Sequence, residues 1–107
     1  MNAEQLFNLG YDDGLKSEHS KSKFEMISLE KEYQLGYIIG FSYDEHVTQL
    51  NPLGVIIAIH AQKYCIPDNE IKDKIYQKFE EAAEIIIDYD GYFQNNSQDD
   101  FPDDDEY

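Results

Sequence analysis

The sequence predicts an all-α fold, a compact bundle of about four helices joined at closely packed glycines and followed by an acidic C-terminal tail. Apolar residues recur every three or four positions through most of the chain. Helix-capping residues precede these segments. A nine-residue pattern, here called the glycine repeat, occurs as FNLGYDDGL in residues 7–15 and as YQLGYIIGF in residues 33–41. No segment shows the sustained alternation that is typical of a strand.

The first helix is expected to begin after Asn2 and to end near Lys16. Asn2 is followed three residues later by Gln5, which is the spacing of a capping box. Residues 17–23, SEHSKSK, are polar and predict a flexible loop.

The second helix is expected to begin near Lys23, because Ser22 and Glu25 repeat the capping-box spacing. Apolar residues at helical spacing continue through the second glycine repeat to Tyr43 or Asp44. The pattern therefore predicts one long helix.

The third helix is expected over residues 52–63. Asn51 is a favourable cap, and Pro52 suits the first helical position because its missing N–H would have no helical partner there. The segment LGVIIAIHA is apolar on nearly every face. We therefore expect this helix to be the central and most buried one.

The fourth helix is expected after Pro67, with Asp68 as its cap. The composition changes again near residue 94, so we expect a helical domain over residues 1–93 and an acidic tail over residues 94–107. The apolar face of the fourth helix would hold Ile71, Ile75, Phe79, Ala82, Ala83 and Ile86.

Small residues four positions apart lie on one face of a helix and leave a smooth groove. Glycine costs about 1 kcal/mol relative to alanine inside a helix, so paired glycines indicate a compensating close approach of two helix backbones. The pairs are Gly10 with Gly14, Gly36 with Gly40, and Gly54 with Ala58.

The order of these motifs resembles the YghW-like group of small bacterial proteins. The similar features are GY–DG–L–K, a polar loop, Y–LGY–IGFS, a third helix, and Y–IPDNEI–KIYQKF. The resemblance covers residues 7–79 and implies the same succession of glycine-paired and amphipathic helices. It implies no activity and no site residue, and the acidic tail lies outside it.

The charge of the chain is strongly negative, with 23 acidic and 8 basic residues and a net charge of −15. Such a charge opposes direct binding to nucleic acid or to an anionic membrane, and it favours basic partners. The first residues lack the basic and apolar regions of a signal peptide. The single cysteine fits a reducing compartment. We therefore expect a cytoplasmic protein that does not associate with membranes.

The sequence offers no catalytic or metal-binding motif, so we expect no enzyme activity, no cofactor and no metal site. His60 is expected to be partly buried with its hydrogen bonds satisfied. His19 and His46 are expected to be solvated loop residues. Cys65 is expected to be a buried or half-buried thiol without catalytic activation.

The remaining candidate site is an acidic, aromatic surface in the C-terminal part of the chain. Carboxylates and rings can imitate the phosphates and bases of a single-stranded nucleic acid. The pattern favours an acidic inhibitor or immunity protein for a basic toxin domain, above all a nuclease. The alternatives are a nucleic-acid mimic of the anti-restriction or anti-CRISPR kind and a regulatory adaptor without a nuclease partner. The candidate partner-binding residues are Glu80, Glu81, Glu84, Asp88, Asp90, Tyr92, Asp99, Asp100, Phe101, Asp103, Asp104, Asp105 and Tyr107.

Overall fold

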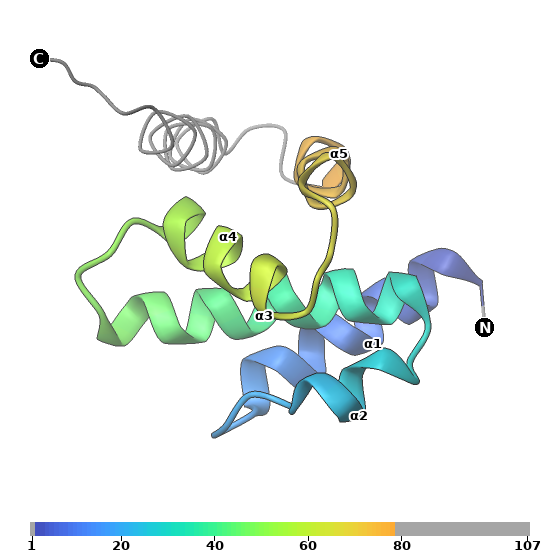
Figure 1. The fold of residues 1–107 in the computed structure, drawn as a ribbon, viewed down its shortest axis with the longest axis horizontal. Helices are drawn as coiled ribbons and strands as arrows, with labels where there is room; N and C mark the ends of the chain where they lie inside the picture. The colour runs from blue at the N-terminus through green and yellow to red at the C-terminus, as the bar shows by residue number, and fades with distance from the viewer. Residues whose placement is uncertain (1, 79–107) are drawn as a thin grey trace, which may run out of the picture.

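A computed structural model describes residues 2–78, and every regular element in that range is a helix. In Figure 1, α3 runs through the centre with α1 along one side and α4 along the other. The all-α prediction is confirmed, and residues 2–78 alone contain five helices where about four were expected. None of the described helices is both long and apolar enough to cross a bilayer. The helices are α1 (Ala3–Lys16), α2 (Lys23–Ile27), α3 (Lys31–Thr48), α4 (Leu53–Lys63) and α5 (Asp68–Lys78).

Helices α1 and α2 begin at the two predicted capping boxes. At α1, the Asn2 side chain accepts a hydrogen bond from the Gln5 amide at 2.8 Å, and the Gln5 side chain accepts one from the Asn2 amide at 3.0 Å. Ser22 and Glu25 make the same reciprocal pair at 3.1 and 2.9 Å. Each box therefore satisfies two amides that the first helical turn leaves without partners.

The prediction of a single helix over residues 23–44 is wrong, because the helix is interrupted between α2 and α3. Helix α2 ends at Ile27, and α3 begins at Lys31. The buried Gln34 side chain donates to the carbonyls of Met26 at 2.7 Å and of Leu29 at 3.0 Å. These carbonyls lie at and just beyond the end of α2, where backbone acceptors lack helical partners. The break is thus stabilised by a residue of the next helix, and the local sequence carries no signal for it.

The starts of α4 and α5 each differ from the prediction by one residue. Pro52 is the N-cap of α4 and not its first helical residue, while the Asn51 carbonyl contacts the ring of His46 at 3.0 Å. Asp68 is the first residue of α5 and not its cap. The carbonyl of Pro67 accepts the amides of the first turn at 3.1 and 3.3 Å. Both prolines therefore precede a helix and contribute only their carbonyl groups.

The predicted close packing of helices at the glycines is confirmed, and the structure shows that the two glycine repeats pack directly against each other. We call this contact between α1 and α3 the glycine seam. A methyl group added at Gly10 would lie 2.2 Å from the carbonyl oxygen of Tyr33, and one added at Gly36 would lie 2.1 Å from that of Phe7. Neither position has room for a side chain, because the opposing atoms belong to a backbone.

The glycine seam has a local two-fold symmetry. The repeats are 26 positions apart, so Gly10 corresponds to Gly36 and Phe7 corresponds to Tyr33. The contact of Gly10 with Tyr33 is therefore the equivalent of the contact of Gly36 with Phe7, and the distances agree within 0.1 Å. Gly14 faces residues further along α3 than Gly10 does, so the two helices run parallel. The chain returns between them through α2 (Figure 1).

Helix α3, and not α4, is the central element of the described fold. All residues from 33 to 40 are buried. Helix α4 is apolar but leaves Ile59 44% exposed. The expectation that α4 is the most heavily buried helix holds against α3, with seven of its 11 residues buried against nine of 18, but the expectation that it is central is wrong. Helix α3 is central because it packs against neighbours on two faces. Its glycines lie against α1, while Ile38 and Ile39 join the apolar core.

Helix α5 is held by apolar and charged contacts. Ile71 and Ile75 are almost completely buried. Between them in the helix, the Nζ of Lys74 lies 2.6 Å from an Oε of Glu32, and Lys74 is only 9% exposed. The pair links α5 to the first turn of α3, so the last described helix is fixed to the central one.

The loop of residues 17–22 is non-helical as predicted, but it is anchored. The hydroxyl of Tyr37 accepts a hydrogen bond from the Lys21 amide at 3.2 Å and donates to Ser17 at 3.1 Å. The hydroxyl of Tyr64 donates to the Lys21 carbonyl. Two buried tyrosines from α3 and the end of α4 thus hold a segment whose polar composition predicts flexibility.

Candidate binding site

The partner-binding residues predicted from the sequence lie outside the described residues. The described structure therefore does not test how these residues are arranged, and they stay a prediction. They are Glu80, Glu81, Glu84, Asp88, Asp90, Tyr92, Asp99, Asp100, Phe101, Asp103, Asp104, Asp105 and Tyr107.

Charge is divided unequally along the chain. Residues 1–78 contain twelve acidic residues and all eight lysines, whereas residues 79–107 contain eleven acidic residues and no basic one. Three lysines of the described part form ion pairs within it, at 3.0 Å for Lys31 with Glu70, 4.0 Å for Lys72 with Asp68, and 2.6 Å for Lys74 with Glu32. The helical part is therefore only weakly acidic, and most of the net charge follows it in the sequence.

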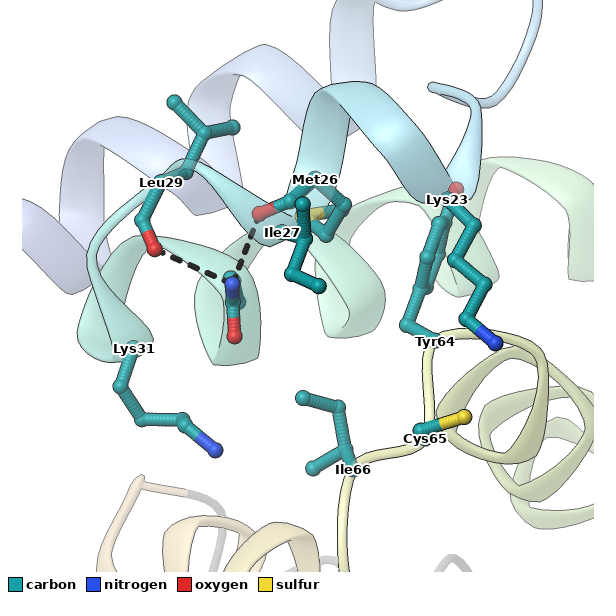
Figure 2. Close-up of a pocket in the computed structure, with 9 residues that line it drawn as sticks. Lys23, Met26, Ile27, Leu29, Lys31, Tyr64, Cys65 and Ile66 are labelled. Atoms are coloured by element: carbon teal, nitrogen blue, oxygen red, sulfur yellow. Dashed lines mark hydrogen bonds between the residues drawn. The ribbon is translucent and has the colours of Figure 1, made fainter.

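An open pocket of about 550 Å³ lies between α2, the first turns of α3 and the turn that joins α4 to α5 (Figure 2). Its lining is apolar around a few polar groups, which is typical of pockets that bind small molecules or peptide side chains. The lining residues are Lys23, Met26, Ile27, Leu29, Lys31, Gln34, Tyr64, Cys65 and Ile66.

The break between α2 and α3 forms one wall of this pocket. The hydrogen bonds of Gln34 to the carbonyls of Met26 and Leu29 join the end of α2 to the central helix at this wall. Ile27, the last residue of α2, is 71% exposed and lines the pocket. The wall therefore presents an apolar side chain to solvent.

The opposite wall is formed by a tight turn at the end of α4. The Cys65 amide donates to the Gln62 carbonyl at 3.1 Å, and the Ile66 amide donates to the Ala61 carbonyl at 2.8 Å. This is the Schellman arrangement, which satisfies the last carbonyls of a helix. Cys65 occupies its left-handed position with φ of 60°, where glycine is usual. The turn places Tyr64 and Ile66 in the core and Cys65 at the surface.

The exposed position of Cys65 corrects the prediction of a buried or half-buried thiol. The residue follows a buried tyrosine and precedes a buried isoleucine, and the left-handed turn directs it away from both. Burial raises the pKa of the neighbouring Tyr64 hydroxyl above its usual 10.0, so this group stays neutral at physiological pH. Lys23 and Lys31 are the charged groups in the lining, which contains no acidic residue.

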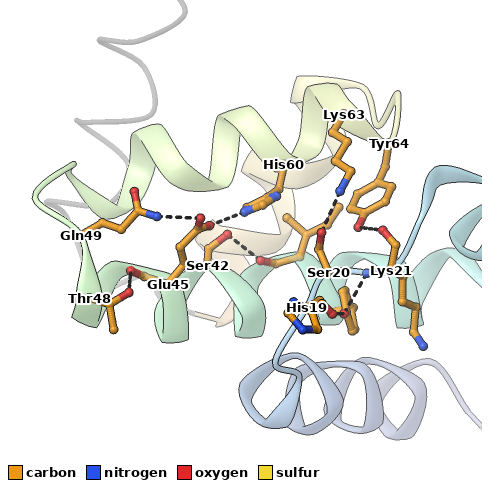
Figure 3. Close-up of polar contacts among 12 residues, drawn as sticks. His19, Ser20, Lys21, Ser42, Glu45, Thr48, Gln49, His60, Lys63 and Tyr64 are labelled. Atoms are coloured by element: carbon orange, nitrogen blue, oxygen red, sulfur yellow. Dashed lines mark hydrogen bonds and ion pairs between the residues drawn. The ribbon is translucent and has the colours of Figure 1, made fainter.

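A second polar cluster joins α3 and α4 (Figure 3). The Nε2 of His60 lies 2.5 Å from an Oε of Glu45, whose other oxygen accepts from Gln49 at 2.9 Å. The Nδ1 of His60 is buried and has no hydrogen-bond partner. The expectation that the hydrogen bonds of His60 are satisfied therefore holds for Nε2 and is wrong for Nδ1. The buried Nδ1 is out of reach of a substrate, so the arrangement serves to join the two helices.

The other histidines differ in position. His19 lies in the loop and is exposed, as predicted. His46 is wrongly predicted as a loop residue, because α3 continues to Thr48 and includes it in its last turn. Across residues 2–78, no group of three or more histidine, cysteine, aspartate or glutamate side chains is placed to hold a metal ion.

Sequence reasoning missed the pocket. Its walls depend on the α2–α3 break and on the left-handed turn at Cys65, and neither feature has a glycine to mark it. Pro67, two residues after Cys65, marks an interruption between helices but does not indicate the conformation of the turn.

Comparison of this chain with models of protein families, with curated proteins and with solved structures gives no match.

Proposed function

We propose that the protein is an acidic inhibitor, of the kind that confers immunity, which binds a basic toxin domain and blocks its active-site cleft. A nuclease is the partner that fits best, because its cleft is built to bind a polyanion. In this proposal the chain acts by binding and carries out no reaction itself.

The observation that carries the proposal is the unequal division of charge. Eleven acidic residues and no basic residue follow position 78, whereas the helical part contains all eight lysines. Clustered charge of one sign steers an oppositely charged partner and raises the rate of association. The helical part then serves as the folded carrier of this acidic region.

The aromatic residues among these acids support a nuclease as the partner. Tyr92, Phe101 and Tyr107 are interspersed with carboxylates. Rings can occupy the surfaces on which a nuclease stacks bases, while carboxylates occupy its phosphate sites. The same feature favours the second candidate, a nucleic-acid mimic directed at several DNA-binding proteins.

The test is a pull-down from the native cell with tagged full-length protein, eluted with rising salt. Two variants separate a local acidic site from net charge alone. One replaces five acids of the tail by amides (Asp99, Asp100, Asp103, Asp104 and Asp105). The matched control replaces five exposed acids of the helical part by amides (Glu4, Asp12, Glu18, Asp44 and Asp73).

We expect one basic protein at stoichiometric yield, lost from the tail variant and kept by the control. Because electrostatic association weakens as salt rises, it should elute early in the gradient. Equal loss from both variants would mean that only net charge matters. Recovery of many DNA-binding proteins would support the mimic, and recovery of no basic protein would leave a regulatory adaptor as the better description.

A further inference from the structure

The pocket between α2 and the α4–α5 turn is lined by two lysines, one of which is paired with Glu70. Its lining holds Lys23 and Lys31 and no acidic residue, although the chain carries a net charge of −15. Lys23 is exposed, and no ion pair is found for it among residues 2–78. Lys31 pairs with Glu70 at 3.0 Å but remains 49% exposed. The ammonium group of Lys23 is therefore accessible to an anionic ligand, and that of Lys31 is partly accessible beside Glu70.

The walls between these lysines suit an apolar group. Met26 and Ile66 are buried side chains on opposite walls of the pocket, and Ile27, next to Met26 on α2, is 71% exposed. Figure 2 shows these side chains between Lys31 on one side and Lys23 on the other. A ligand that fits would combine one ring or aliphatic group with carboxylates on both sides of it.

We propose that this pocket binds the segment of residues 99–107 of the same chain, with Phe101 between the apolar walls. In that segment Asp99 and Asp100 precede the ring and Asp103 follows it closely. The carboxylates would lie against Lys23 and Lys31, and the ring would cover Ile27. Charge complementarity of this kind fixes orientation more than it adds affinity.

The length of the chain permits the contact. Phe101 is 23 residues beyond Lys78, the last described residue. An extended chain of that length reaches roughly 75 Å. The longest dimension of the molecule is 53 Å. Because the segment is attached to its site, even a weak affinity gives high occupancy.

The inference does not depend on the proposed partner, because it concerns one chain alone. The pocket also contains a residue whose chemical reactivity can report whether the pocket is covered. Cys65 is the single cysteine, it is exposed, and it lines the pocket. A segment bound there would shield the thiol, so the rate of reaction with the uncharged reagent N-ethylmaleimide measures how often the pocket is covered.

The experiment compares this rate in the full-length protein and in full-length variants at low salt. Phe101→Ser should raise the rate about threefold, the change expected when the segment covers the pocket about two-thirds of the time. Lys23→Gln should also raise it. Loss of a nearby positive charge by itself makes a thiol less reactive, so an increase in Lys23→Gln reports uncovering. High salt should raise the wild-type rate toward that of the variants.

Two matched controls should leave the rate unchanged. Tyr89→Ser removes another ring that stands between two aspartates. Lys16→Gln removes an exposed lysine outside the pocket. A rate unaltered by Phe101→Ser, or altered equally by Tyr89→Ser, would overturn the proposal. Protection that increases with protein concentration would also overturn it, because the occupant would then be a second copy.

Discussion

The two copies of the glycine repeat share their sequence pattern but differ in how far their residues are buried. The copy in α3 is buried along nearly its whole length, because residues 33–40 are all buried. The copy in α1 buries only Phe7, Gly10 and Gly14. The shared glycines form the same contact from both sides, so they do not account for the difference, whereas Leu9 is 40% exposed and its counterpart Leu35 is 4% exposed.

The difference arises from the two variable residues of the repeat. They are Asp12 and Asp13 in α1, and Ile38 and Ile39 in α3. The isoleucines are 1% and 0% exposed and belong to the core. Asp12 is exposed. The glycines thus determine that the helices meet, and the variable pair determines which of them becomes central.

Exchanging one variable residue between the copies should give the largest effect. Ile38→Asp places a carboxylate in the core and removes a buried side chain. We expect a loss of more than about 4 kcal/mol in the free energy of unfolding, because burial of an unpaired charge adds to the lost apolar contact. Chemical denaturation followed by circular dichroism measures it.

The reciprocal change Asp12→Ile is the matched control. Its site is exposed, so the free energy of unfolding should change by no more than about 0.5 kcal/mol. Comparable losses in the two variants would contradict the asymmetry of the copies.

A change at the glycines should affect both copies equally. Gly10→Ala and Gly36→Ala each place a methyl group against an opposing carbonyl oxygen, at 2.2 and 2.1 Å. We expect each to lower the free energy of unfolding by about 3 kcal/mol through overpacking. The double variant should cost less than the sum, because either methyl already separates the helices.

The control is Asn8→Ala, at an exposed position of α1. It should change stability little or raise it slightly, since alanine favours helix. If Gly10→Ala is as stable as this control, the seam is not tightly packed.

The smallest effect should come from making the first residue of the two repeats more alike. Tyr33→Phe matches Phe7 and removes the hydrogen bond from the Tyr33 hydroxyl to an Oδ of Asp13, which is 2.6 Å long. We expect a loss of about 1 kcal/mol at neutral pH. Thermal unfolding at several pH values measures it.

The stability difference between the wild type and Tyr33→Phe should change with pH in a defined direction. Burial and then the hydrogen bond to Asp13 raise the pKa of Tyr33 above its usual 10.0. The contribution of Tyr33 is therefore complete below pH 10 and declines as the pH rises through 10 toward the folded-state pKa. The difference between the wild type and Tyr33→Phe should shrink over that range. If the stability difference stayed constant over this pH range, the pKa of the Tyr33 hydroxyl would be the same in the folded and unfolded states.

Much of the fold was predictable because its signals are local. The capping boxes at Asn2 and Ser22 depend on residues three positions apart, and the glycine pairs on residues four apart. The break before α3 was not predictable, since it depends on Gln34 reaching back to Met26. The central position of α3 was missed because apolar content alone favoured α4.

The candidate site was less predictable than the fold. The acidic residues after position 78 are evident from composition, but a composition gives no arrangement in space. The pocket depends on a non-glycine residue, Cys65, in the left-handed conformation, and such a residue has no sequence signature.

The parallel glycine seam also has a consequence for the order of folding. Helix α1 has 14 residues, and a helix of this length is marginal in water without packing. Its partner surface lies 26 residues further along the chain. On the ribosome, α1 therefore emerges well before the surface that can stabilise it. We expect a nascent chain halted before residue 41 to lack stable helix, and the first three helices to form together once that residue is available.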